Sequence, residues 1–116
     1  MRAFFILLAA SIPSALLAEE NCTIRQKYSC EAAGCKTVSP AVWNVIDQAK
    51  KTYARCDPRG CDTYDAQFKV SGDFTNIEVP GRGMLAKIGA NGGAFVEVVT
   101  IGSSVLTSFG TCRNKD

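Results

Sequence analysis

Histidine is absent from this chain of 116 residues. Its absence removes the usual general base of enzymes, the usual Ser–His–Asp triad and a frequent zinc ligand. Charge of one sign is not in excess either, because 13 lysines and arginines stand against 11 aspartates and glutamates. Nucleic-acid binding domains normally carry a clear basic excess. The composition therefore argues against common hydrolases and against a nucleic-acid partner.

Long apolar runs are also absent after residue 18. An apolar run at residues 3–17 follows a single arginine. Ala18 comes directly after the run, and two glutamates follow Ala18. This is the layout of a secretory signal peptide, and the run is shorter than the roughly 20 apolar residues that a membrane span needs. We expect cleavage after residue 18, to within a few residues. The mature chain, residues 19–116, is then a single domain without a membrane span, in the periplasm or outside the cell.

Cysteine, by contrast, is abundant, and all of it lies in the mature part. The six residues are Cys22, Cys30, Cys35, Cys56, Cys61 and Cys112. The Cys-x-x-Cys spacing of redox centres is missing, and an even number of cysteines in a short exported chain favours disulfides over a metal site. We expect three disulfides, with 15 pairings open from the sequence alone, and no metal or cofactor. Each bond would add about 2–4 kcal/mol to a domain with a small core.

Residues 40–54 fit two structures. Ser39-Pro40 is a good start for a helix, and apolar residues follow at helical spacing. They are Val42, Val45, Ile46, Ala49 and Tyr53. The alternative is a hairpin, in which residues 42–46 and 52–56 are strands rich in β-branched and aromatic side chains, with a polar turn between them. We favour the hairpin and keep an α+β fold with one helix at 40–54 as the alternative.

Short strands dominate the rest of the prediction, because apolar and polar residues alternate between turn signals. The expected strands are residues 63–70, 74–79, 84–88, 95–101 and 105–109. Asn91-Gly92-Gly93 is a strong hairpin turn. Residues 19–39 fit an N-terminal arm held to the core by disulfides. The chain is therefore predicted to be mainly β, a small antiparallel meander that forms a barrel or a sandwich.

The loop at 80–83 is the strongest candidate for a binding site. Arg82 stands there between Gly81 and Gly83, after a proline. An arginine on such a loop can bind a carboxylate or phosphate, or enter the cleft of a partner. The alternative is a tight link between two strands with a solvated arginine.

Acidic residues offer only weak candidates for chemistry. Asp57, Asp62 and Asp65 do not match the spacing of a calcium loop, and an aspartate beside a turn usually caps the local backbone. Glu78 and Glu97 would have to converge to act as an acid–base pair. Both lie on expected strands, where we predict that they face water.

Several motifs resemble those of small exported cysteine-rich proteins of bacteria, a group without an assigned activity. These motifs are Tyr53-x-Arg55-Cys56-Asp57, Gly60-Cys61-Asp62-x-Tyr64, Pro80-Gly81-Arg82-Gly83 and Ser108-Phe109-Gly110-x-Cys112. In size, export and expected topology the chain also loosely resembles the periplasmic inhibitors of C-type lysozymes. That resemblance implies a compact barrel that presents a loop to an enzyme's cleft. The inhibitors' own Tyr- and Lys-Gly-containing site motifs are not found here, so no inhibitory residue is carried over.

We therefore expect an exported, non-enzymatic binding protein, such as an inhibitor, with another protein as its partner. Arg82 and its flanking glycines are the expected contact. Two alternatives stay open. One is a structural or envelope-stress protein without a defined ligand, and the other is a hydrolase that uses a pair of carboxylates.

Overall fold

The computed structural model describes residues 19–89 and 93–114. The expected signal peptide, residues 1–18, and most of the expected turn at 91–93 lie outside these residues. The described chain forms ten strands: β1 (Glu20–Glu31), β2 (Gly34–Thr37), β3 (Trp43–Asp47), β4 (Thr52–Asp57), β5 (Gly60–Asp65), β6 (Gln67–Ser71), β7 (Phe74–Val79), β8 (Met84–Gly89), β9 (Gly93–Ile101) and β10 (Ser104–Asn114).

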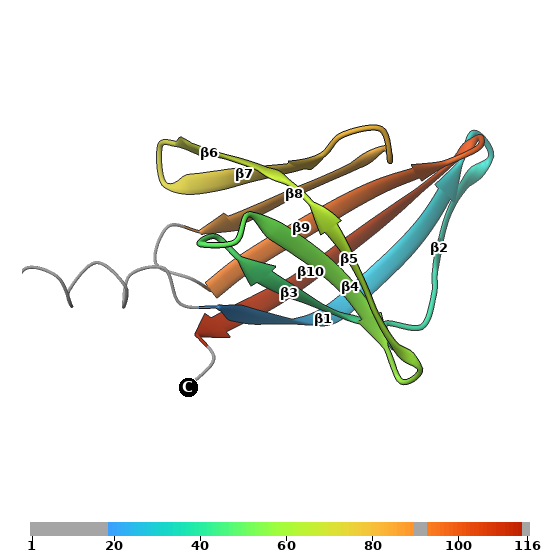
Figure 1. Ribbon diagram of the computed structural model, residues 1–116. Coiled ribbons are helices and arrows are strands. Elements are labelled where there is room, and N and C mark those ends of the chain that lie inside the picture. The colour runs from blue at the N-terminus through green and yellow to red at the C-terminus, as the bar shows by residue number, and fades with distance from the viewer. Residues whose placement is uncertain (1–18, 90–92, 115–116) are drawn as a thin grey trace, which may run out of the picture.

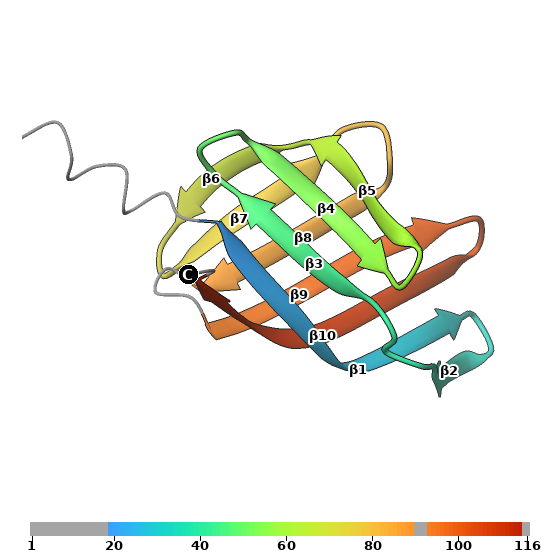
Figure 2. The same cartoon turned by 60° about the horizontal axis from the view of Figure 1, so that its bottom comes forward.

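One antiparallel sheet contains all ten strands. Its order is β5-β4-β3-β1-β10-β9-β8-β7-β6, and β2 also pairs with β1. The two outermost strands, β5 and β6, are consecutive in the chain and separated only by Ala66, so the sheet curls into a nearly closed barrel (Figures 1 and 2). The Ala66 amide donates to the Lys51 carbonyl at 3.0 Å, which fastens this corner to the β3–β4 turn. The predicted β class and barrel are confirmed.

The favoured hairpin is also confirmed, and no helix forms at 40–54. β3 and β4 pair directly, with Ile46 opposite Tyr53, and both side chains are fully buried. The turn is stabilised locally, because Asp47 Oδ1 accepts a hydrogen bond from the Lys50 amide at 3.0 Å. β-Branched and aromatic residues fit a half-buried pleated surface better than a helix.

The interpretation of residues 19–39 as an arm is wrong. This segment supplies β1, which has 12 residues and lies between β10 and β3 near the middle of the sheet. A β-bulge explains why its strand pattern is hidden. Ile24 and Gln26 pair with consecutive residues of β10 and leave Arg25 unpaired, which moves the inward positions from even to odd numbers.

The single strand expected at 63–70 is likewise broken in two. The chain turns a corner at Ala66, between β5 and β6, and Val70 is 70 % exposed rather than buried. The alternation expected at 74–79 is confirmed, because Thr75, Ile77 and Val79 are buried. The barrel interior is filled by apolar side chains from seven of the strands and the Ala66 corner. They are Cys22, Ile24, Ile46, Tyr53, Ala66, Ile77, Val79, Met84, Ala86, Ile88, Phe95, Val99 and Cys112.

Three disulfides cross-link the sheet, as expected. They join Cys22 to Cys112, Cys30 to Cys35 and Cys56 to Cys61. Each joins two residues that lie directly opposite each other on neighbouring strands, with Cα atoms 3.9–4.0 Å apart. Such bonds indicate an oxidising compartment other than the cytoplasm. In the described residues, no helix has the length and apolar character required to span a membrane.

Candidate functional site

The predicted contact loop is held tightly between two parts of the barrel. The guanidinium of Arg82 lies over the Tyr64 ring, 5.3 Å from its centre. The carbonyl of Gly83 accepts hydrogen bonds from the Thr100 amide at 2.9 Å and from its hydroxyl at 3.4 Å. Gly83 also has a φ of +65°, and a Cβ atom there would collide with Thr100. These contacts give the loop a structural role, and its expected role in binding stays a prediction.

Glu78 and Glu97 do not converge, whereas Asp57 and Asp62 line one surface pocket together with Arg55 and Arg59. The Asp57 carboxylate accepts hydrogen bonds from the amide of Arg59 at 2.8 Å and from its guanidinium at 3.0 Å. These contacts lower the pKa of Asp57, and they show the local turn role that its position suggested. Glu78 is exposed on the outer face of the sheet, whereas Glu97 points inward. The carboxylate pair that a hydrolase would need is not formed by these two residues.

The prediction that Glu97 faces water is wrong, because this side chain is only 2 % exposed and belongs to a buried cluster of polar residues. We call this cluster the polar centre; it consists of Lys27, Asn44, Tyr53, Arg55, Glu97 and Ser108. Glu97 Oε2 accepts hydrogen bonds from Tyr53 at 2.5 Å, from Asn44 at 3.2 Å and from Arg55 at 3.2 Å. A buried carboxylate is tolerated only with partners of this kind.

Five strands bring the polar centre together. Lys27 on β1, Ser108 on β10 and Glu97 on β9 occupy successive positions across the sheet. Asn44 and Arg55, which face each other on β3 and β4, approach from the other side of the barrel. The bulge at Arg25 is what turns Lys27 inward, because an unbroken alternation from Cys22 and Ile24 would have aimed it at solvent.

Electrostatics in the polar centre are unusual. Burial, followed by the neighbouring charge of Glu97, raises the pKa of the Tyr53 phenol far above its usual value. The phenol therefore stays protonated and donates to the carboxylate. Burial, followed by the positive charge of Arg55, lowers the pKa of the Lys27 amine, and Glu97 offsets this only in part. Perturbed groups of this kind often mark functional sites.

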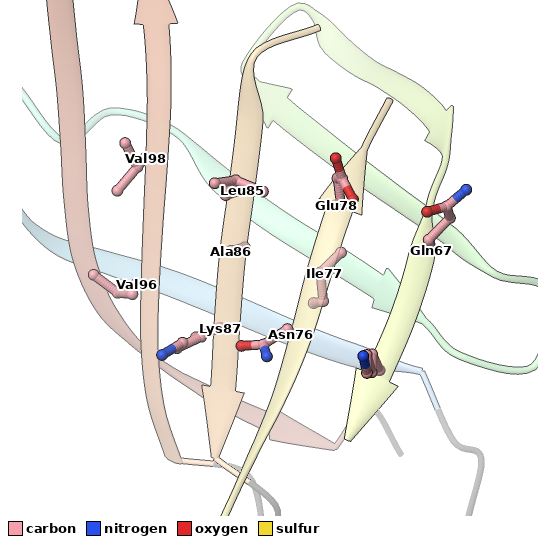
Figure 3. Close-up of a pocket in the computed structure, with 10 residues that line it drawn as sticks. Gln67, Asn76, Ile77, Glu78, Leu85, Ala86, Lys87, Val96 and Val98 are labelled. Carbon is pink, nitrogen blue, oxygen red and sulfur yellow. The ribbon is translucent and has the colours of Figure 1, made fainter. Parts of the chain in front are cut away.

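A second feature lies on the opposite surface of the sheet, over β6–β9. This outer groove has a volume of about 470 Å³ and is lined by Gln67, Lys69, Asn76, Ile77, Glu78, Leu85, Ala86, Lys87, Val96 and Val98. Figure 3 shows Val96, Lys87 and Asn76 along one line across the strands and Val98, Leu85 and Glu78 along the next. The volume lies within the range of small-molecule sites.

The groove is chemically polarised from one strand to the next. Lys69, Asn76, Lys87, Val96 and Phe109 occupy successive positions across β6, β7, β8, β9 and β10. One end therefore carries two ammonium groups around an amide, and the other end is apolar. Leu85, on β8 opposite Val98, is 56 % exposed, and Phe109, which lies opposite Val96 but outside the residues that line the groove, is 46 % exposed. These apolar side chains are therefore open to solvent. The buried Asn76 Oδ1 atom has no partner among the described residues.

Sequence reasoning missed both features for the same reason. Neither the polar centre nor the outer groove contains a local motif, because each takes one to three residues from each of several strands. The one available signal was the alternation in residues 95–99, which places Glu97 on the same face as Phe95 and Val99. A glutamate between two core positions indicates a buried charge. The residues that pair with it could not be predicted, because they depend on the order of the strands in the sheet.

Comparison with known proteins gives no assignment. No protein-family model, no curated protein and no solved structure matches the chain. The functional argument therefore depends on the geometry described above.

Proposed function

We propose that the protein is an exported, non-enzymatic binding protein, and that its outer groove binds an anionic amphiphile such as a long-chain carboxylate. The observation that carries this proposal is the order Lys69, Asn76, Lys87, Val96, Phe109 across five strands. Two cations at one end complement an anionic head group, and exposed apolar side chains at the other end complement a hydrocarbon chain.

Dimensions support the same ligand class. Strands lie about 4.8 Å apart, so the four strands that line the groove span about 14 Å. This matches an extended chain of the dodecanoate type, with its carboxylate over Asn76 and its tail across Val96. Glu78 lies at the polar end, where it disfavours a ligand with several negative charges and favours a single carboxylate.

The scaffold supports a binding role outside the cytoplasm. Three disulfides fix the strands in an oxidising compartment, and a rigid sheet keeps the groove formed before a ligand arrives. Secretion through residues 1–18 belongs to the proposal. The intact mass of the exported protein tests it, because export predicts a chain that starts at or near Glu19 and takes up alkylating reagent only after reduction.

Calorimetric titration of the oxidised mature protein with dodecanoate, below its micelle concentration, tests the groove. We expect saturable binding of one molecule. Lys69→Met with Lys87→Met should weaken it about tenfold or more, which corresponds to about 1.4 kcal/mol. Lys36→Met, on the exposed strand β2, is the matched control for charge. Dodecylammonium should bind much more weakly than dodecanoate.

The contribution of the groove's apolar side chains to binding can also be tested against a matched control. Leu85 and Ile101 are each 56 % exposed, but only Leu85 lines the groove. Leu85→Ser should weaken dodecanoate binding and Ile101→Ser should not. Equal effects of the two changes, or equal binding of dodecylammonium, would refute the proposal. A sedimentation mass of two chains that falls to one in Leu85→Ser would instead assign the groove to self-association.

A further inference from the structure

Inside the barrel, the polar centre holds more positive than negative charge. Lys27 and Arg55 face the single carboxylate of Glu97, and only Arg55 is within ion-pair distance of it, with Nε 3.2 Å from Oε2. Asp62 is opposite Arg55 in the register of β4 and β5, but it is exposed and beyond ion-pair distance. The second cation of the polar centre, Lys27, therefore has no counter-charge within ion-pair distance among the described residues.

Lys27 is the unexplained cation. The residue is 9 % exposed, its amine reaches solvent, and the amine forms no hydrogen bond or ion pair with residues 19–89 or 93–114. Neighbouring positive charge adds to burial in lowering its pKa, which is consistent with an uncompensated site.

Further polar groups beside Lys27 are also unused. The hydroxyl of Ser108, which lies between Lys27 and Glu97 in the sheet register, is buried and has no partner among the described residues. Arg55 uses only Nε for Glu97, so the terminal nitrogens of its guanidinium are left over in the described structure. A buried hydroxyl such as that of Ser108 normally has a partner, which is sometimes an ion or a water molecule.

We propose that a small oxyanion, of the short carboxylate or phosphate class, binds in the polar centre between the Lys27 amine and the Arg55 guanidinium, with the Ser108 hydroxyl as a third donor. A water molecule could satisfy the hydrogen bonds, but only an anion also balances the second cation. The free edge of Arg55 suits the two oxygens of a carboxylate. Arg55, whose side chain is 24 % exposed, also lines a surface pocket of about 340 Å³ together with Arg59 and the carboxylates of Asp57 and Asp62.

Titration of the oxidised mature protein with formate, acetate and phosphate tests this site, with ionic strength held constant by the bulky anion gluconate. Nuclear magnetic resonance reports where each anion acts through the backbone amides. We expect saturable binding of one anion, with the largest shifts at Lys27, Arg55 and Ser108. Shifts that rise linearly with concentration, or that lie mainly at exposed lysines, would overturn the proposal. The relative affinities of the three anions identify the preferred class.

Variants of the polar centre test the anion site independently of the chemical shifts. Lys27→Met keeps the length of the side chain and removes its charge, and it should lower anion affinity at least tenfold, whereas Lys36→Met on β2 should leave it unchanged. Should Lys27→Met fail to fold, Ser108→Ala is the second variant. It removes only a hydroxyl that has no partner in the described structure, and we expect a several-fold loss of affinity. Unchanged anion binding in either folded variant would refute the site.

The site in the polar centre is separate from the outer groove. Changes at Lys69 and Lys87 should leave formate binding intact, and Lys27→Met should leave dodecanoate binding intact. Failure of either proposal therefore does not decide the other.

Discussion

Arg82 lies over the ring of Tyr64, with its guanidinium carbon 5.3 Å from the ring centre. The turn between β7 and β8 is thereby held against β5, next to the corner at Ala66 where the barrel closes. The arginine that the sequence offers as a contact for a partner thus has a partner within the chain.

This pair gives the first prediction. A double-mutant cycle with Arg82→Ala and Tyr64→Leu should show a coupling of about 0.5–1 kcal/mol in the free energy of unfolding, as expected for a cation and an aromatic ring near the surface. Urea denaturation measures it. Dodecanoate binding should be unchanged in Arg82→Ala. Additive effects of the two changes would show that the contact adds nothing to closure of the barrel.

The buried carboxylate gives the second prediction. Glu97→Gln leaves Arg55 and Lys27 without a counter-charge and should lower the free energy of unfolding by about 3–5 kcal/mol. Glu78→Gln is the matched control on the outer face, and its effect should stay within about 0.5 kcal/mol. Chemical denaturation of both variants makes the comparison. Similar small effects would mean that the polar centre is open to water.

The raised pKa of Tyr53 predicts that the free energy of unfolding falls at alkaline pH. Its pKa is raised in the folded protein, so above a pH of about 10 the unfolded chain loses this proton and the folded one keeps it. The stabilising contribution is complete below that pH and declines above it. Urea midpoints at pH 9 and pH 11 should therefore fall more in the wild type than in Tyr53→Phe. The lowered pKa of Lys27 acts in the opposite direction, and an equal fall in both proteins would contradict the role of Tyr53.

The disulfides should differ in their contributions to stability. Cys22 and Cys112 are 90 residues apart in sequence, whereas Cys30 and Cys35 are five apart. Restriction of the unfolded chain predicts a loss of about 4.6 kcal/mol when the first pair is replaced by alanines and about 2.2 kcal/mol for the second. Thermal and urea unfolding of the two double variants test the order. A larger effect of the Cys30–Cys35 pair would contradict this account.

The local features of the fold could be predicted from the sequence. β-Branched residues at the two ends of residues 42–56 favoured the hairpin, and alternation placed Thr75, Ile77 and Val79 on one face of a strand. The errors have one physical cause, a break in alternation. The bulge at Arg25 hid β1, and the corner at Ala66 made two strands look like one.

The candidate sites were beyond prediction for a different reason. Lys27 and Ser108 are 81 positions apart in the chain but directly opposite each other in the sheet, and no propensity or motif encodes that pairing. The same holds for Lys69 and Lys87, which flank Asn76 only because β7 lies between β6 and β8. Strand order and register decide both sites, and they are set by the whole fold.

The bond between Cys22 and Cys112 has a further consequence for how the protein responds to proteolysis. It encloses every strand from β2 to β9 in one covalent ring. A single cut in any turn within that ring opens the backbone but leaves both fragments attached to each other. A nicked molecule would therefore migrate as one species until it is reduced, and the uncut strand pairings would hold the outer groove and the polar centre in place.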